Sequence, residues 1–221
     1  LMCDAGMFKE AEQFERQLLE YYPDKSHGFL GHISLRQGKF KEANKAYKYE
    51  YEKDTSNNIF LHWLAESYYY LNHFDSAEFY FRKLEKKYQE NPGLEIDFLI
   101  TYRARLAYAL IQQGKKAEAE RYLLQHIDKL KSMNDPARWA YDIAYAYAYQ
   151  GNVKESVKYL KKMDFWWVTY GLIKVDPMFN PIRGEPEFQQ ELYRMESEMM
   201  ELRDELMIGR FEEELSWYFE K

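Results

Sequence analysis

Apolar residues recur every three or four positions along most of the chain, which is the spacing of one face of an α-helix. One such run follows Gly38 and another follows Asn72. Clusters of Asn, Asp, Pro and Gly at residues 91–93 and 134–136 interrupt the pattern, as turns between helices do. The pattern therefore predicts an all-α protein. The two clearest runs are Phe40, Ala43, Ala46, Tyr47 and Tyr51, and Phe74, Ala77, Phe81, Leu84 and Tyr88.

A six-residue motif recurs and predicts where the helices turn. Each copy opens with Gly or Asn, which adopt positive φ at a helix C-terminus, and closes with a small residue where two helices can touch. The openings are 32, 34, 42 and 37 residues apart, which indicates one helical hairpin per repeat. The copies occupy residues 6–11, 38–43, 72–77, 114–119 and 151–156.

A second signal is independent of the first. Eight residues before four of the turns, a large apolar residue is followed by Gly or Ala, and a small side chain there allows the partner helix to approach closely. The pairs are Leu30-Gly31, Leu64-Ala65, Leu106-Ala107 and Ile143-Ala144.

Together the two signals resemble the tetratricopeptide repeat family, in which antiparallel helix pairs of about 34 residues carry a Leu-Gly pair and a Gly-x-Tyr/Phe-x-x-Ala turn. The resemblance covers residues 1 to about 163 and implies a right-handed superhelical solenoid of antiparallel helix pairs. The turn at Gly6 has almost no helix before it, so we expect a truncated first repeat and an upstream region. The chain departs from the family at the Trp of the first helix, which is replaced by His27, Leu61, Arg103 and Ala140.

Three regions are predicted: a repeat array at residues 1–163, an aromatic and proline-rich connector at 164–186, and a C-terminal helix at 187–221. Three prolines within residues 177–186 predict an irregular extended segment. Residues 176–188 resemble the ending that follows repeat arrays in multidomain bacterial signalling proteins. This resemblance implies that the array belongs to a larger regulatory protein.

The C-terminal helix has two interpretations. Its apolar residues follow the spacing of a coiled-coil seam, but fewer than three heptads are present, so it either caps the last hairpin or pairs with a second copy. Aromatic residues at 165–167 form either a wall of the core or a docking patch, and those at 217–219 fold back or dock on a neighbour. The seam consists of Phe188, Leu192, Met195, Met199, Leu202 and Leu206.

The composition argues against several classes of partner. The 31 Lys and Arg residues are outnumbered by 37 Asp and Glu, and a net charge of −6 has the wrong sign for binding nucleic acid. No stretch approaches the roughly 20 uncharged residues that a membrane-spanning helix needs. A lone Cys3 cannot form an internal disulfide, and the chain does not open with a secretory leader, so a cytoplasmic location is favoured.

No catalytic or metal-binding constellation is present in the sequence. Cys3 has no nearby His, and His27 and His32 stand five residues apart, where a helix points them in different directions. No glycine-rich phosphate loop occurs. We therefore predict a protein without enzymatic activity, cofactor or metal.

The first helix of each hairpin should line a concave groove that binds a peptide or a partner helix. Positions ten and six residues before each turn residue fall in that groove, and they become aromatic toward the C-terminal side. These positions lack the Lys and Asn residues with which a carboxylate clamp binds the C-terminus of a peptide. As an alternative to facing the groove, Tyr145 packs against the next helix. The predicted groove residues are His32, His62, Glu66, Tyr108, Tyr141 and Tyr145, flanked by Trp63, Tyr69, Arg105 and Arg138.

The sequence thus predicts a non-catalytic domain that binds a protein or peptide, as the interaction or sensor part of a larger bacterial regulator. The alternative is a homodimerisation unit in which the array and the C-terminal helix position an upstream effector.

Overall fold

The computed structural model describes residues 7–22, 26–90, 102–132, 140–163 and 170–207. Every regular element within these ranges is a helix and none is a strand, which confirms the all-α prediction. The helices are α1 (Phe8–Tyr21), α2 (Gly28–Arg36), α3 (Phe40–Lys53), α4 (Asn58–Tyr70), α5 (Phe74–Glu90), α6 (Tyr102–Gln112), α7 (Lys116–Ser132), α8 (Ala140–Tyr149), α9 (Val153–Leu160), α10 (Tyr170–Val175), the 3-10 helix η3 (Pro177–Ile182) and α11 (Pro186–Met207).

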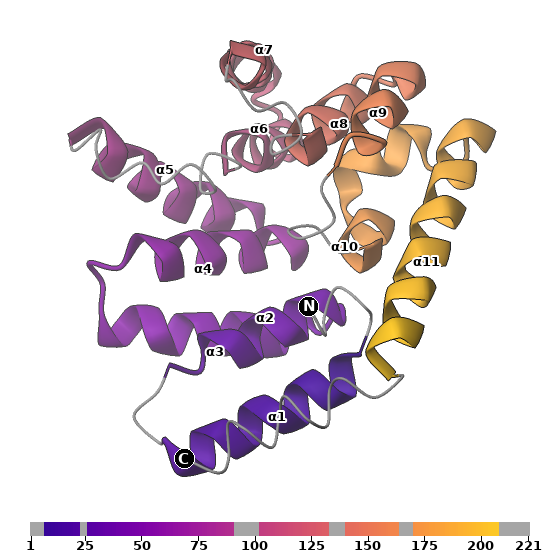
Figure 1. Cartoon of the computed structure of the whole chain (residues 1–221). Coiled ribbons are helices and arrows are strands. Elements are labelled where there is room, and N and C mark those ends of the chain that lie inside the picture. The colour runs from indigo at the N-terminus through magenta and orange to yellow at the C-terminus, as the bar shows by residue number, and fades with distance from the viewer. Residues whose placement is uncertain (1–6, 23–25, 91–101, 133–139, 164–169, 208–221) are drawn as a thin grey trace.

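Helices α2 to α9 form four hairpins, in which each even-numbered helix packs against the helix that follows it. Helix α1 precedes them, and the predicted turn at Gly6 lies outside the described residues. The hairpins stack one on the next from α1 at one end to α9 at the other (Figure 1). The array is a solenoid of helix pairs held by one nearly continuous core.

The turns within the hairpins form at the predicted residues. Gly38, Asn72, Gly114 and Gly151 all have positive φ, between 60° and 79°. In each turn the following amide donates to a carbonyl five residues back, which satisfies a carbonyl at the end of the helix. These amide-to-carbonyl bonds run from Lys39 to Ser34, from His73 to Tyr68, from Lys115 to Leu110 and from Asn152 to Tyr147.

The small residues of the second signal lie where the helices meet. Ala65, Ala107 and Ala144 are fully buried. A Cβ placed on Gly31 would lie 2.6 Å from the ring of Tyr47, so α2 and α3 can pack this closely only because Gly31 has no side chain. The predicted close contact is confirmed at Gly31, and the three alanines are buried as such contacts require.

The connector differs from the extended segment that its prolines predicted. Residues 170–175 form α10, and residues 177–182 form η3, whose Met178, Phe179 and Ile182 side chains are fully buried. Proline is compatible with this turn because Pro177 occupies the first helical position, where no amide donor is needed. The Asp176 side chain accepts from the Met178 amide and caps the turn.

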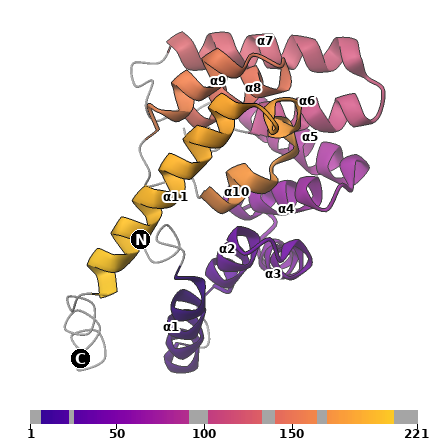
Figure 2. The ribbon, with the colours of Figure 1, turned by 90° about the vertical axis from the view of Figure 1, so that its right-hand side faces the viewer.

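Helix α11 packs against α9 and α10 through its first turns, where Phe188, Leu192 and Met195 are buried. Figure 2 shows its C-terminal end extending away from the array. Tyr193 and Met200 are exposed to solvent. The first half of α11 therefore covers the end of the array, while the side chains of Leu202 and Leu206 lie outside the described residues.

Candidate functional site

The six predicted groove residues divide into two groups. His32 and Tyr108 are half-buried. The other four side chains are buried, with exposed fractions of 4% for His62, 7% for Glu66, 5% for Tyr141 and 0% for Tyr145. The expectation that these four side chains face an open groove is therefore corrected.

The chain's own connector covers Tyr141, whose hydroxyl and ring contact residues 176 and 179. Helix α10 lies beside α4 in both views (Figures 1 and 2), and a Cβ placed on Gly171 would be 3.1 Å from the carbonyl oxygen of Arg36 at the end of α2. The η3 turn then packs against α8, where Phe179 contacts Tyr141 with ring centroids 6.0 Å apart. Residues 170–182 therefore pass across the first helices of the hairpins, which is the path predicted for a bound peptide.

Asp176 is the centre of this contact. The Tyr69 hydroxyl donates to its Oδ1 at 2.7 Å, and the hydroxyls of Tyr70 and Tyr141 donate to its Oδ2 at 3.2 and 3.0 Å. The Asp176 side chain is fully buried, and burial raises the pKa of all three tyrosines, so their hydroxyls keep their protons and donate. Helices α4 and α8 thus build a cradle of hydroxyls around one carboxyl group.

Arg105 of α6 provides the positive charge behind this cradle. Its Nη2 lies 3.0 Å from Oε1 of Glu66 and 4.0 Å from Oδ2 of Asp176. Although burial acts to lower the pKa of Arg105, Glu66 and the surrounding tyrosines hold it well above its usual value. The guanidinium lies 5.6–6.0 Å from the ring centroids of Tyr69, Tyr70, Tyr141 and Tyr145, within cation–π range.

Further titratable groups lie in the same interior. Burial lowers the pKa of His32, His62 and His126 to about 3, so all three are neutral near pH 7. Burial raises the pKa of Asp142 to about 7. His32 has a hydrogen-bond partner in the Tyr47 hydroxyl, at 3.3 Å, whereas neither ring nitrogen of His126 has one among the described residues.

Sequence reasoning found part of this site. It placed Tyr69 and Arg105 beside the groove and missed Tyr70 and Asp176. The Asp-Pro pair at 176–177 was the available signal, because Asp before Pro commonly caps a turn. The predicted flanking residue Arg138 and the aromatic residues at 165–167 and 217–219 lie outside the described residues.

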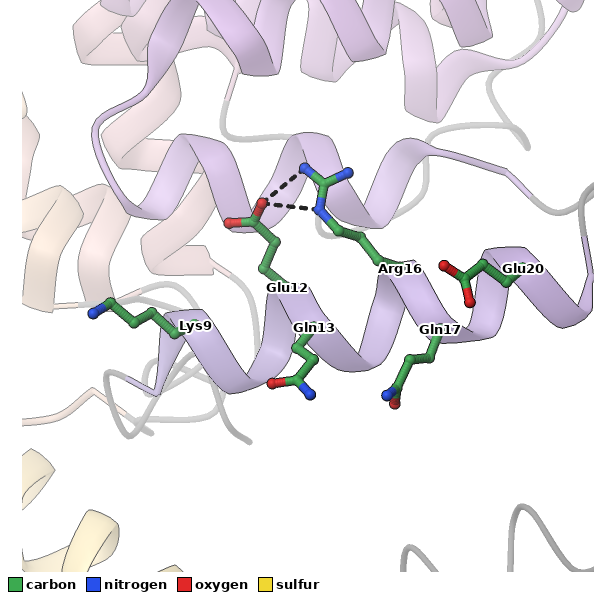
Figure 3. A pocket seen from close by; sticks show the side chains of 6 residues that line it. All are labelled: Lys9, Glu12, Gln13, Arg16, Gln17 and Glu20. Atoms are coloured by element: carbon green, nitrogen blue, oxygen red, sulfur yellow. Dashed lines mark hydrogen bonds and ion pairs between the residues drawn. The ribbon is translucent and has the colours of Figure 1, made fainter.

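A separate surface hollow lies along α1 and is lined by polar side chains of this helix alone (Figure 3). Glu12 and Arg16 are hydrogen-bonded to each other at 2.8 Å within it. The hollow has neither the buried donors nor the aromatic rings of the Asp176 cradle. Its lining residues are Lys9, Glu12, Gln13, Arg16, Gln17 and Glu20.

Within the described ranges, no three His, Cys, Asp or Glu side chains come together as a metal site would require. None of the helices in those ranges combines the length and apolar character needed to cross a bilayer.

The stacked hairpins decide the class of fold. The chain is a helical-repeat protein. It matches no family model and no curated protein, so membership of the tetratricopeptide repeat family stays a prediction. Two solved structures are similar: MamA AMB-1, with a TM-score of 0.45 and 19% identity, covering 73% of this chain and 83% of that chain, and BtubC (BKLC) from P. vanneervenii, with a TM-score of 0.49 and 14% identity, covering 94% and 92%. At these scores neither structure carries an argument about what this chain binds.

Proposed function

We propose that this chain is a non-catalytic scaffold that binds a protein or peptide along the first helices of its hairpins, as the interaction or sensor part of a larger regulatory protein. The observation that carries the proposal is the path of residues 170–182. This segment, which consists of α10 and η3, lies across these helices and is held there by three tyrosine hydroxyls and buried apolar side chains. The surface is thus suited to a peptide that folds into a turn or a short helix.

Two of the predicted groove residues keep part of their surface exposed. His32 and Tyr108 are half-buried on α2 and α6. Tyr108 also packs edge-on against Tyr69, with centroids 5.6 Å apart, so it lies directly beside the Asp176 cradle. Tyrosine buries a large area at low entropic cost and keeps a polar group, which suits a binding surface.

Selection of a displayed peptide library against the full chain tests this proposal. Peptides that bind should lose at least fivefold in affinity with the Tyr108→Ala and His32→Ala variants. The matched control is Phe79→Ala, which removes an exposed aromatic ring of α5 on a second helix of a hairpin and should leave affinity unchanged. Failure to select any binding peptide, or equal losses for all three variants, would contradict the proposal.

The alternative is a homodimer formed through α11. Tyr193 and Met200 are seven residues apart, two helical turns, and both are exposed, while the buried seam of α11 faces the array. Sedimentation of the wild type and of Tyr193→Ala at micromolar concentration tests this alternative. A monomer in both cases excludes dimerisation as the main role at that concentration.

A further inference from the structure

We propose that the cradle formed by Tyr69, Tyr70, Arg105 and Tyr141 recognises a carboxylate followed by an apolar turn, that residues 176–182 occupy it as an internal ligand, and that a partner protein carrying a segment of this chemistry binds by replacing them. This inference rests on the proposed function, because it names the ligand class of the same groove.

The contacts around Asp176 have the chemistry of carboxylate recognition. Asp176 accepts four hydrogen bonds, three from tyrosine hydroxyls of the array and one from the Met178 amide at 3.0 Å. Each carboxyl oxygen has two of these donors around it, and a carboxyl group offers enough lone pairs to accept them all. Arg105 adds a positive charge 4.0 Å from Oδ2. The cradle therefore selects for a carboxylate.

The occupant of the cradle is a self-contained turn. Its amides donate to its own carbonyls, as Phe179 does to Asp176 and Arg183 does to Asn180. The Arg183 side chain donates to the carbonyl of Asp176 at 2.7 Å and also binds the carbonyl of Lys174. Residues 173–183 can therefore leave the groove without breaking their own hydrogen bonds, as a pre-organised peptide ligand would.

Arg105 keeps a carboxyl partner when the occupant leaves. Arg105 is closer to Glu66, at 3.0 Å, than to Asp176, at 4.0 Å. Withdrawal of Asp176 therefore leaves an Arg–Glu pair and three hydroxyls that water can reach, rather than an unpaired buried cation. Because the Arg105–Glu66 pair remains, a carboxylate of the partner can take the place of Asp176.

The apolar part of the ligand is defined by the same turn. Met178, Phe179 and Ile182 are fully buried, and Phe179 also stacks on Phe188 of α11 with centroids 5.3 Å apart. A partner segment should therefore carry apolar side chains two, three and six residues after its carboxylate.

The test uses the full chain and a fluorescent synthetic peptide with the sequence of residues 172–185. A Met178→Ala variant, whose own turn is held less firmly, should bind this peptide at least tenfold more tightly than the wild type does. The peptide carrying Asp176→Ala should bind at least tenfold more weakly. Equal binding of both peptides, or binding of neither to a variant that circular dichroism shows to be folded, would overturn the inference.

A double-mutant cycle separates recognition from general stability. Tyr69→Phe in the Met178→Ala chain removes one donor to the carboxylate, so it should weaken the Asp peptide about tenfold and the Ala peptide not at all. Tyr47→Phe is the matched control, because that hydroxyl meets His32 rather than Asp176. Equal losses for both peptides with Tyr69→Phe would mean that the hydroxyl only supports the fold, and would refute carboxylate recognition.

A measurement on the wild type covers the case in which Met178→Ala does not fold. Excess peptide should increase hydrogen exchange of the amides in residues 172–183, because the internal turn is displaced, and unchanged exchange at saturation refutes displacement. Dimers of Met178→Ala formed by exchange of its own turn would refute the assignment of the ligand to a partner protein. Library peptides that bind without competing with the 172–185 peptide would refute this inference and leave the proposed function standing.

Discussion

Replacement of Asp176 by Ala is the sharpest test of what holds the connector in the groove. The substitution removes the acceptor of three tyrosine hydroxyls and of the Met178 amide. It leaves those hydroxyls buried without their partner, and it removes the cap of η3. Loss of these hydrogen bonds destabilises the fold. An opposing effect stabilises it, because the variant no longer pays for the burial of a carboxylate.

The magnitude follows from these two effects. Hydrogen bonds to a charged group contribute about 1.5–3 kcal/mol each, and the desolvation of a buried carboxylate offsets several kcal/mol of their sum. Each buried hydroxyl left without its acceptor costs about 1–3 kcal/mol. We therefore expect Asp176→Ala to lower the free energy of unfolding by about 3–5 kcal/mol, or the melting temperature by roughly 6–20 °C in a chain of this size.

Urea denaturation followed by circular dichroism and by tyrosine absorbance measures this loss. The matched control is Asp54→Ala, which removes an exposed carboxyl group that accepts from the amide and hydroxyl of Ser56 in a local turn. Asp54→Ala should lower the free energy of unfolding by at most about 1 kcal/mol, as the loss of an exposed cap does. A loss for Asp176→Ala that equals the loss for Asp54→Ala would refute the view that Asp176 anchors the connector.

Three further predictions follow from the array itself. Gly31→Ala should destabilise the chain by about 1 kcal/mol or more in urea denaturation, because a Cβ 2.6 Å from Tyr47 overpacks the core by more than the gain in helix propensity; Gly184→Ala, with open space around it, should not. Asn72 has φ 60°, so Asn72→Ala should cost about 1 kcal/mol whereas Asn72→Gly should be neutral or better by the same assay. His126 is neutral in the fold, with its pKa lowered to about 3, and takes up a proton on unfolding below its ordinary pKa of 6.5, so its contribution to stability is complete above pH 6.5 and is lost as the pH falls toward 3. His126→Leu should therefore reduce the slope of stability against pH between 4 and 6 by about 1.4 kcal/mol per pH unit, and an unchanged slope would contradict this reasoning.

The hairpins were predictable from the sequence because their determinants are local. Gly38, Gly114 and Gly151 form turns through backbone conformations that few other residues adopt, and these conformations are set within a few residues of the chain. The close approach at Gly31 was also predictable, since its position relative to Gly38 fixes the face of α2 that it occupies.

The candidate site was only partly predictable because its contacts are distant in the sequence. Tyr69 meets Asp176 across 107 residues, and no periodic pattern encodes that distance. The prolines of the connector excluded a long helix, but they did not exclude the short turn that starts at Pro177. Burial of Tyr141 follows from this turn covering it, so position on the first helix of a hairpin could not by itself predict exposure.

Competition with the internal turn sets what a partner must provide. A tethered segment acts at an effective concentration of about millimolar, so a free peptide of identical chemistry at about 10 µM is outcompeted roughly 100-fold. Burial of three apolar side chains contributes roughly 5–9 kcal/mol to either ligand and does not distinguish them. A partner must therefore gain its advantage outside the cradle, and the half-buried rings of Tyr108 and His32 lie on the first helices along which such a ligand would extend. The carboxylate then determines which segments fit, whereas contacts at these flanking rings determine which of them can displace residues 176–182.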